Sequence, residues 1–584
     1  MFRTSHKLAL LLLLVLPASV GLGQSAKSPS ASHLALQRGQ DALKNGDTAK
    51  ARTEFERAVR LSPKDAVAQS SLGWVLAQQG DLEAAVTRLR AAIKLKPTYP
   101  EAHLTLATVL LQQGNIPDAE QEARQSISIA PQNAEAHRTL AKVLSQSPGD
   151  ESVTEMRRAT QLAPQRADLQ DELGTILAQR KQFADAQQAF QDALHLEPNL
   201  ESAHFHLGVV DLQQLRLDDA ASEMGKAIEL NPADAAAHYY LAKAFAAQSK
   251  TPEALAELRK AAALKPEWFE LQVELGIASQ RAGDVDGAIK AFNEALRLHP
   301  QDADIYNDLG LALLQTGNAE NAIPKFKTAV QLKPQDGSLR GNLAIAYMQL
   351  TNFDAAVSEL ETAIKIAPAN ASLHYDLGLA YKLKDQLDKA VEEFHEAIRL
   401  QPDLADAHYT LGVLLWQRGE FDKAAAELRE AIQNQPNYAE AHYTLGTVFK
   451  QQGKLQDSAA QLSEAIRLQP DFAGAHTTLA AVLRQLGDSE GAAAEAKEGA
   501  RIAASVNNLQ AAKVSTNSGK RLLGAGDLDG AITQFRSAIH SEPKYAIAHY
   551  QLGLALQQSG QKDEAKKEFQ KAAELDPQFT MPAK

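Results

Sequence analysis

The chain has 584 residues, of which 45% are hydrophobic and 5% aromatic, and it contains no cysteine. The absence of cysteine excludes disulfides, zinc–thiolate sites, thiol nucleophiles and the lipid-bearing cysteine of a bacterial lipoprotein. The formal net charge of −12 at pH 7 gives no general attraction to nucleic acid, whose phosphates are neutralised by Lys and Arg in its binding proteins. We therefore expect no nucleic-acid partner.

The N-terminus has the order of a secretory signal peptide. Arg3 and Lys7 precede an apolar run at residues 8–16, and small residues follow at 18–23. Positive charge, a short apolar core and small residues in that order are typical of a cleaved signal. Nine or ten apolar residues are also too few to span a bilayer comfortably. Residues 1–23 are therefore predicted to be a signal peptide.

The cleavage site is predicted after Gly23, and Val20 and Ala26 are alternative last residues of the signal. Residues 24–31 would form a linker. Cleavage removes two positive charges, so the mature chain would carry a net charge of −14. Export without disulfides indicates a bacterial envelope protein, periplasmic or secreted, that is stabilised by helix packing alone.

One proline recurs along the chain with a spacing of almost always 34 residues. Its fifteen members are Pro63, Pro97, Pro131, Pro164, Pro198, Pro232, Pro266, Pro300, Pro334, Pro368, Pro402, Pro436, Pro470, Pro543 and Pro577. Self-similarity at a fixed period of 20 to 50 residues indicates a repeat architecture in place of a single core. Because each repeat contacts only its neighbours, such an array can grow long without enlarging one core.

Residues 405–436 show the repeated unit most clearly. Both halves of this segment carry apolar residues at helical spacing, which indicates two amphipathic helices. Gly419 lies between the halves, where a glycine can take a left-handed backbone and end a helix. Pro436 has no amide hydrogen and ends the unit. The unit is predicted to be two antiparallel helices joined by a tight turn.

Small residues recur at fixed places in the unit. A glycine lies midway through the first helix in most copies, although it costs about 1 kcal/mol relative to alanine inside a helix. Its recurrence predicts close approach of another helix at that point. The glycines are Gly73, Gly174, Gly208, Gly276, Gly310, Gly378, Gly412, Gly446 and Gly553.

The whole pattern resembles the tetratricopeptide repeat family. The family signature has a leucine–glycine pair in the first helix, then an alanine, a large residue, an alanine and a proline in the second. The matching residues here are Leu411, Gly412, Ala424, Leu428, Ala431 and Pro436. We count sixteen copies between residues 32 and 577. The resemblance implies an all-α, right-handed superhelical α-solenoid of helix-turn-helix repeats, in which the first helices line the concave side.

Two departures mark the array. The fourth copy is one residue short and has residues 147–149 (Ser-Pro-Gly) at its turn, and the fourteenth ends at Ala504 without a proline. We therefore predict repeats 1–14 at residues 32–504, an irregular insertion at 505–511, repeats 15 and 16 at 512–577, and a tail at 578–584. The insertion is interpreted either as a bend or break in the array or as a tolerated surface insertion.

Nine of the sixteen histidines occupy one repeat position: His103, His137, His204, His238, His374, His408, His442, His476 and His549. A metal ladder would need ligands within about 2 Å of one ion. Equivalent helices of neighbouring repeats lie roughly 8 to 10 Å apart. We interpret these histidines as packing residues and predict no metal site and no cofactor.

No catalytic motif stands out. The chain has no G-x-S-x-G elbow, no phosphate-binding loop, no H-E-x-x-H and no dinucleotide fingerprint. The repeats occupy nearly the whole chain, and only seven residues follow Pro577. No separate catalytic domain, no catalytic residues and no enzyme activity are therefore expected.

The candidate binding residues follow from the resemblance. The position after the histidine and the position seven residues later should face the same side of the first helix. In repeats 11 to 14 these positions include Tyr375, Lys382, Tyr409, Trp416, Tyr443, Lys450 and Arg484. Tyr, Trp and Arg are enriched in binding hot spots. The hypothesis is an aromatic and basic patch that receives an extended or helical peptide; the alternative is that the tyrosines only pack against neighbouring repeats.

The sequence thus predicts a non-catalytic protein–protein interaction scaffold or adaptor of the bacterial cell envelope, in which several weak groove contacts add up. The alternative is an accessory subunit of a complex for envelope polysaccharide synthesis or glycosyl transfer and modification. A third hypothesis is a cryptic hydrolase or transferase. The sequence leaves the identity of the partner open, and it is compatible with both a monomer and an end-to-end oligomer.

Overall fold

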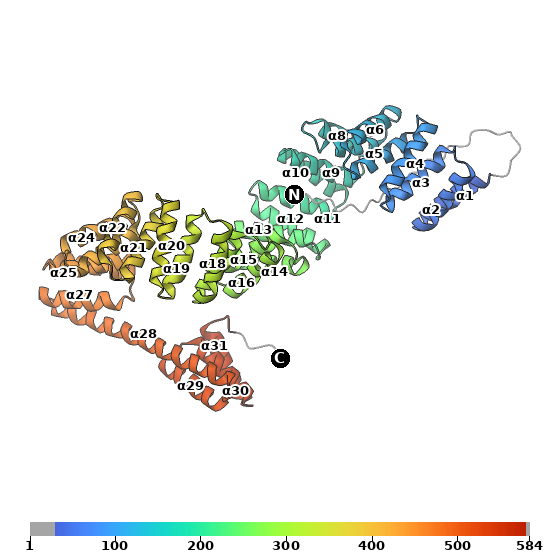
Figure 1. The fold of residues 1–584 in the computed structure, drawn as a ribbon. Helices are drawn as coiled ribbons and strands as arrows, with labels where there is room; N and C mark the ends of the chain where they lie inside the picture. The colour runs from blue at the N-terminus through green and yellow to red at the C-terminus, as the bar shows by residue number, and fades with distance from the viewer. Residues whose placement is uncertain (1–29, 580–584) are drawn as a thin grey trace. The chain divides into compact units, whose positions relative to one another are not determined.

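The computed structural model describes residues 30–579, and this part of the chain forms 31 helices and contains no strand (Figure 1). Consecutive helices pair into antiparallel hairpins, one hairpin for each predicted repeat. The chain divides into two units, residues 1–300 and 301–584. We call them unit 1 and unit 2 and describe each by itself.

Unit 1 contains the first sixteen helices. They are α1 (Ala31–Lys44), α2 (Thr48–Leu61), α3 (Ala66–Gln78), α4 (Leu82–Leu95), α5 (Pro100–Gln112), α6 (Ile116–Ile129), α7 (Ala134–Leu144), α8 (Glu151–Leu162), α9 (Ala167–Gln179), α10 (Phe183–Leu196), α11 (Glu201–Gln213), α12 (Leu217–Leu230), α13 (Ala235–Ala247), α14 (Thr251–Leu264), α15 (Phe269–Arg281) and α16 (Val285–Leu298).

Unit 2 contains the remaining fifteen. They are α17 (Ala303–Gln315), α18 (Ala319–Leu332), α19 (Gly337–Gln349), α20 (Phe353–Ile366), α21 (Ala371–Leu383), α22 (Leu387–Leu400), α23 (Ala405–Gln417), α24 (Phe421–Asn434), α25 (Ala439–Gln451), α26 (Leu455–Leu468), α27 (Ala473–Leu486), α28 (Ser489–Gly524), α29 (Leu528–Ser541), α30 (Ala546–Gln558) and α31 (Lys562–Leu575).

The glycine of the first helix is where the two helices of a hairpin come closest. A Cβ atom built on Gly378 of α21 would lie 2.6 Å from Cε1 of Phe394 in α22, so no side chain fits there. Phe394 is fully buried, as are Ala390 and Ala397 on either side of it. Burying one such ring contributes roughly 1.5 to 3 kcal/mol. The predicted close approach is confirmed, and the approaching helix is the partner in the same hairpin.

The turn between the two helices of a hairpin needs a left-handed residue. Gly419, between α23 and α24, has a φ of 78°, which glycine adopts without strain. Five turns reach the same conformation without glycine, at a cost of about 1 to 2 kcal/mol each. These residues are Lys181, Leu215, Ser249, Thr351 and Asp385, with φ between 57° and 61°.

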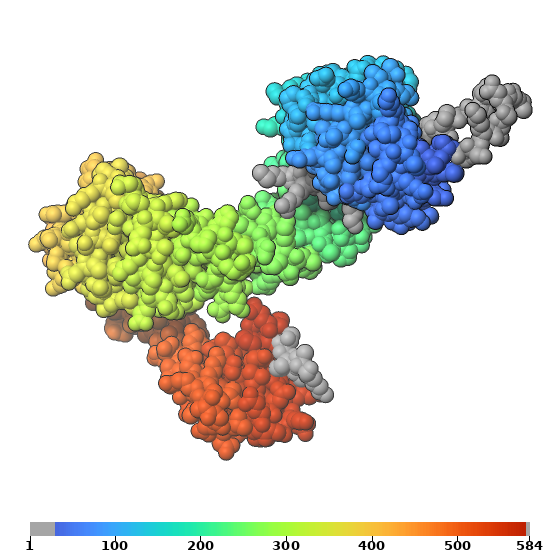
Figure 2. Space-filling model, turned by 45° about the vertical axis from the view of Figure 1, so that its right-hand side comes forward, coloured from blue at the N-terminus to red at the C-terminus, as the bar shows by residue number. Residues whose placement is uncertain are grey.

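Neighbouring hairpins share a continuous apolar core. In unit 2 one cluster of buried residues runs from Ala344 in α19 to Phe449 in α25, and in unit 1 another runs from Ala35 in α1 to Val143 in α7. In unit 2 the colours of Figure 2 run in chain order from green through yellow to orange. Each repeat is therefore stabilised mainly by the repeats before and after it, as expected for an α-solenoid.

The irregular insertion predicted at residues 505–511 is wrong. These residues lie inside α28, a single helix of 36 residues (Figure 1). The chain has no proline and no glycine between Gly499 and Gly519, so nothing ends the helix where other repeats have their proline. α28 is both the second helix of repeat 14 and the first helix of repeat 15. Sixteen repeats therefore have 31 helices.

The predicted signal peptide and most of the linker fall in residues 1–29, and most of the predicted tail falls in residues 580–584. Both segments lie outside the described residues. Between residues 30 and 579, no helix has the length and apolar character that crossing a membrane requires.

Candidate functional site

Four successive first helices of unit 2 carry the predicted binding residues: α21, α23, α25 and α27. We call the seven residues the aromatic–basic strip: Tyr375, Lys382, Tyr409, Trp416, Tyr443, Lys450 and Arg484. Within one helix the paired positions are seven residues apart, which is close to two full turns. The two side chains of a pair therefore leave the same side of their helix.

The tyrosines of the strip pack against the repeat that follows and stay half-buried. The ring of Tyr409 lies 4.9 Å from that of Tyr438, measured between centroids, and Tyr443 lies 4.7 Å from Phe472. The hydroxyl of Tyr438 donates to Oδ1 of Asp406 at 3.0 Å. Packing against neighbouring repeats, the alternative considered above, is thus present. The rings of Tyr409 and Tyr443 nevertheless keep part of their surface exposed. This packing therefore leaves both rings accessible to a binding partner.

Trp416 is held by the next repeat as well. Its indole Nε1 donates to Oε1 of Gln451 at 2.8 Å, and the ring is only partly buried. The hydroxyl of Tyr375 lies 3.4 Å from Oγ1 of Thr410 on the neighbouring helix. These contacts fix aromatic side chains before any partner arrives, which lowers the entropy that binding must remove.

The cations of the strip have no partner of their own. The side chains of Lys382, Lys450 and Arg484 make no hydrogen bond or ion pair with any residue in the described part of the chain. Lys382 and Lys450 are partly exposed and Arg484 is exposed. Three unneutralised positive charges on the same set of first helices as the partly buried aromatic rings suit a segment that carries carboxylates and apolar side chains.

A partly buried carboxyl group lies next to the strip. Burial raises the pKa of Asp376, which follows Tyr375 on α21, to about 6. No side-chain hydrogen bond or ion pair joins Asp376 to another described residue. Burial also raises the pKa of Tyr375 and of Tyr409, so both hydroxyls stay neutral and able to donate.

The recurring histidines form a second set of ordered polar groups. All nine are buried in the fourth position of their repeats. Nε2 lies 3.0 to 3.3 Å from the carbonyl oxygen of the proline six residues earlier. Nδ1 lies 2.5 to 2.7 Å from a side-chain oxygen of the second helix. That oxygen belongs to a glutamate in eight repeats and to Gln461 in the case of His442.

In two of these pairs the carboxylate favours the charged form of the histidine ring. The hydrogen bond to Glu427 raises the pKa of His408, and the bond to Glu568 raises that of His549. A backbone carbonyl and a carboxylate both accept, so the charged rings of His408 and His549 donate from both nitrogens. Within residues 30–579, no group of His, Asp and Glu is arranged to hold a metal ion. The histidines thus tie the two helices of a hairpin to the preceding proline.

The glutamate partners were missed in the sequence, although a signal for them is present. A glutamate recurs 18 or 19 residues after eight of the nine histidines, and two repeats without the histidine carry another interacting pair at these positions. Arg340 replaces histidine in repeat 10, and its Nη1 pairs with Oε2 of Glu359 at 2.8 Å. In repeat 9, Nζ of Lys325 lies 6.0 Å from the ring centroid of Tyr306.

The first helices of unit 1 carry a different set of charges at the corresponding positions. Glu172 of α9 accepts hydrogen bonds from Nε of Arg138 and Nζ of Lys142 in α7, both at 2.7 Å. Nη1 of Arg138 also donates to Oε2 of Glu135 at 3.2 Å, and Glu135 pairs with Arg166 as well. These charges neutralise one another across repeats 4 and 5. They leave no unpaired cation like those of the strip.

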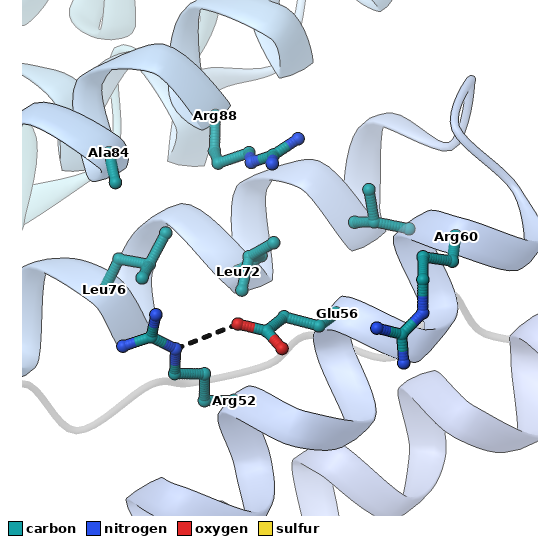
Figure 3. Close-up of a pocket in the computed structure, with 8 residues that line it drawn as sticks. Arg52, Glu56, Arg60, Leu72, Leu76, Ala84 and Arg88 are labelled. Atoms are coloured by element: carbon teal, nitrogen blue, oxygen red, sulfur yellow. Dashed lines mark hydrogen bonds and ion pairs between the residues drawn. The ribbon is translucent and has the colours of Figure 1, made fainter.

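A small pocket of about 270 Å³ lies between α2, α3 and α4 of unit 1. Val59, Leu72, Leu76 and Ala84 supply apolar lining, and Arg52, Glu56, Arg60 and Arg88 supply charged lining (Figure 3). Nε of Arg52 pairs with Oε1 of Glu56 at 2.9 Å, whereas the other two guanidinium groups pair with no described residue. The lining suits a carboxylate carried on an apolar group.

The hairpins, their turns and their shared cores define a helical-repeat scaffold. Family models of the tetratricopeptide repeat match residues 36–100, 172–223, 205–267, 273–337, 443–507 and 516–578, and also 76–143 and 313–380. A third model, described as a TPR repeat, matches residues 382–417 and 414–453. The first of these models alone matches more than half of the chain. The chain therefore belongs to the tetratricopeptide repeat family, and its architecture is an all-α solenoid.

Several solved structures resemble this chain in fold. The APC/C hetero-tetramer Cut9–Hcn1 is 15% identical over 78% of this chain and 97% of its own, with a TM-score of 0.35. YrrB, described as a TPR protein with an unusual peptide-binding site, is 27% identical over 32% of this chain and 97% of its own, with a TM-score of 0.28. MamA is 26% identical over 28% of this chain and 97% of its own, with a TM-score of 0.26. The comparison with curated proteins returned no match.

Proposed function

We propose that this protein is an exported, non-catalytic scaffold of the bacterial cell envelope that binds a peptide or protein segment on the aromatic–basic strip of unit 2. The coarser statement, a protein–protein interaction scaffold, follows from the repeat family and fold. The finer statement rests on one observation: at two equivalent positions of their first helices, four successive repeats together carry four partly buried aromatic rings and three unpaired cations.

The spacing of the strip suits an extended or helical segment. Equivalent positions recur once per repeat, and helices in contact lie roughly 8 to 10 Å apart. A segment with apolar side chains and carboxylates at that spacing would place each apolar group beside a tyrosine or Trp416 and each carboxylate beside a cation. Every single contact would be weak, and several together would give useful affinity.

The proposed export rests on the order of residues 1–23, with two cations followed by an apolar run and small residues. The test is N-terminal sequencing of the protein recovered from the envelope fraction of a bacterial host. A mature chain that begins at Gln24, or after one of the two alternative cleavage points, supports export. An uncleaved cytosolic chain contradicts it.

The binding proposal is tested by crosslinking the exported full-length chain in the bacterium that encodes it and identifying its partners. The variant in which both Tyr409 and Trp416 become alanine should lose capture of a strip-bound partner at least tenfold. A matched control replaces Asn307 and Leu314, which occupy the corresponding positions of repeat 9, and should capture normally. Circular dichroism should show the same helicity for both variants. Equal capture by the two variants would remove the strip from the proposal.

The same experiment separates the scaffold from the alternative function. Protein partners alone support the scaffold. A co-purifying glycan or polysaccharide synthase would instead favour an accessory subunit of an envelope polysaccharide synthesis or modification complex. Turnover by the purified chain would overturn the non-catalytic assignment.

A further inference from the structure

The middle of α28 exposes a helix face that other repeats bury. The third residue of a repeat reports whether a preceding helix covers that face. In repeats 2–14 and 16 this residue is at most 4% exposed. The residues are Ala68, Ala102, Ala136, Leu169, Ala203, Ala237, Leu271, Ile305, Leu339, Leu373, Ala407, Ala441, Ala475 and Ala548.

Repeat 15 is different. Its third residue, Val514, is 60% exposed, more than the 38% of Leu34 in the first repeat, which has no repeat before it. The cause is the continuous helix: the second helix of repeat 14 runs straight into repeat 15 and cannot fold back over it (Figure 1). Repeat 15 therefore begins like a first repeat, in the interior of the chain.

The exposed side of α28 has both apolar and basic character. At 100° per residue, one side carries Val506, Gln510, Lys513, Val514, Asn517 and Arg521, all of them exposed. We call these six residues the open strip. Val506 is also 60% exposed. Two exposed valines one turn on either side of Gln510 form a short apolar stripe along the helix.

The charged residues on this stretch of α28 all have one sign. No Asp or Glu occurs from Gly499 to Gly526, in a chain whose net charge is −12. Lys513, Lys520 and Arg521 are exposed and make no hydrogen bond or ion pair with described residues. Two copies of such a surface repel each other, which argues against pairing of the open strip with itself. An acidic partner is attracted.

We propose that the open strip is a docking site for an acidic amphipathic helix of a partner protein. The partner helix takes the place that the second helix of the preceding repeat occupies elsewhere in the array. Its apolar side covers Val506 and Val514, and its carboxylates face Lys513 and Arg521. This surface is separate from the aromatic–basic strip, so it gives the scaffold a second binding site.

The chain itself supplies a probe of the required chemistry. α12 carries four carboxylates and one lysine, and it packs against α13, where Ala237 is fully buried. A synthetic peptide of residues 217–230, held helical by a side-chain lactam because short helices are marginal in water, imitates the missing covering helix. A control peptide has lysine in place of Asp218, Asp219 and Glu229.

Binding is read from a fluorophore on the open strip of the full-length chain. The protein has no cysteine, so Gln510→Cys gives a single labelling site. We expect saturable binding of the acidic peptide, weakened by salt, and at least tenfold weaker binding of the control peptide. The additional change Val514→Asp should weaken acidic-peptide binding at least tenfold, and Leu34→Asp should leave it unchanged.

Both substitutions fall on exposed residues, so the fold should survive them; circular dichroism checks this. The pair Lys513→Gln and Arg521→Gln, which leaves the apolar stripe intact, should remove most of the preference between the two peptides. Absence of binding by either peptide, equal binding of both, or insensitivity to Val514→Asp would overturn the proposal. None of these results depends on the aromatic–basic strip.

Discussion

Glu172 of unit 1 and Asp376 of unit 2 occupy the same position, the sixth residue of repeats 5 and 11, in opposite surroundings. Burial alone would raise the pKa of Glu172, but the hydrogen bonds and charges of Arg138 and Lys142 hold it below its ordinary value. Asp376 is likewise only partly exposed but pairs with no cation, and burial raises its pKa to about 6.

The same contrast holds for the cations of the two faces. Arg138 and Lys142 are neutralised by carboxylates of neighbouring helices, whereas Lys382 and Lys450 remain unpaired. The helical frame is common to both units, because it depends on the glycine, alanine and phenylalanine positions that pack the hairpin. The remaining positions are free to close a face with ion pairs or to leave it open for a partner.

The largest expected effect comes from breaking the ion pairs of Glu172 in unit 1. Glu172→Ala leaves two partly buried cations without their shared acceptor, at a cost of about 2 to 3 kcal/mol, since removal of one partner from a buried pair is strongly destabilising. Hydrogen exchange of α7–α9 in the full-length protein measures this loss. Lys382→Ala in unit 2 removes a cation that has no partner. It should change the opening free energy of α21, measured by hydrogen exchange, by less than about 0.5 kcal/mol. Similar losses in α7–α9 and in α21 would contradict the contrast between the two units.

Asp376→Asn should raise the free energy of unfolding by about 2 kcal/mol at pH 7.5, after allowance for the partial exposure of this side chain. The pKa is raised in the folded state, so the folded protein loses stability as the pH rises from about 4 to above 6, where this buried carboxyl must ionise. The gain should therefore vanish at pH 4. Thermal unfolding of the wild type and the variant at both pH values tests this. A gain that does not depend on pH would show that burial of the carboxylate is not its cause.

The His408–Glu427 pair should make repeat 12 sensitive to pH. Because the pKa of His408 is raised in the folded state, its contribution is complete below about pH 6.5 and is lost as the pH rises through the raised value. A hydrogen bond to a charged group contributes on the order of 1 to 2 kcal/mol. Hydrogen exchange of α23 and α24 between pH 6 and 9, corrected for intrinsic rates, should report that loss.

Repeat 10 supplies the natural control for the histidine prediction. Arg340 keeps its charge throughout this range, so α19 and α20 should show no such change. Glu427→Gln should also abolish the effect in repeat 12, because it reproduces the His442–Gln461 pair. Equal pH dependence in repeats 10 and 12 would assign the change to something other than the histidine.

The smallest expected effect concerns the turns. Leu215→Gly in unit 1 should stabilise the protein by about 1 kcal/mol, because Leu215 has a φ of 60° and glycine removes that strain. Gly419→Leu in unit 2 should destabilise by a similar amount, since a Cβ there would contact nothing within 4 Å and only the backbone suffers. Melting temperatures of the two variants should move in opposite directions. Shifts in the same direction would mean that side-chain contacts outweigh the backbone.

The residues that pack a hairpin could be predicted because they recur. Gly378 and Phe394 belong to a pattern repeated through the chain, and a glycine that persists inside helices demands a steric reason, which the structure confirms. The candidate strip was also found by register, since residues seven apart share a helix face. Its ring contacts with Tyr438 and Phe472 were not found, because they join different repeats and depend on how one hairpin is rotated on the next.

The insertion at residues 505–511 was predicted wrongly for a related reason. A missing proline and a few extra residues resemble a loop when they are compared with the other repeats. An α-helix, however, continues until something ends it, and residues 500–518 contain neither proline nor glycine. The exposure of Val514 then follows from the position of neighbouring helices, which no single segment records.

The sequence by itself determined the all-α repeat, its period, its turns and the positions that pack each hairpin, because these depend on residues close together in the chain. Only the tertiary structure decided which charges find partners. Glu172 is paired with two cations, whereas Asp376, Lys382 and Lys450 stay unpaired. Pairing depends on side chains of neighbouring repeats meeting within hydrogen-bond distance, and that distance is set by the stacking of hairpins.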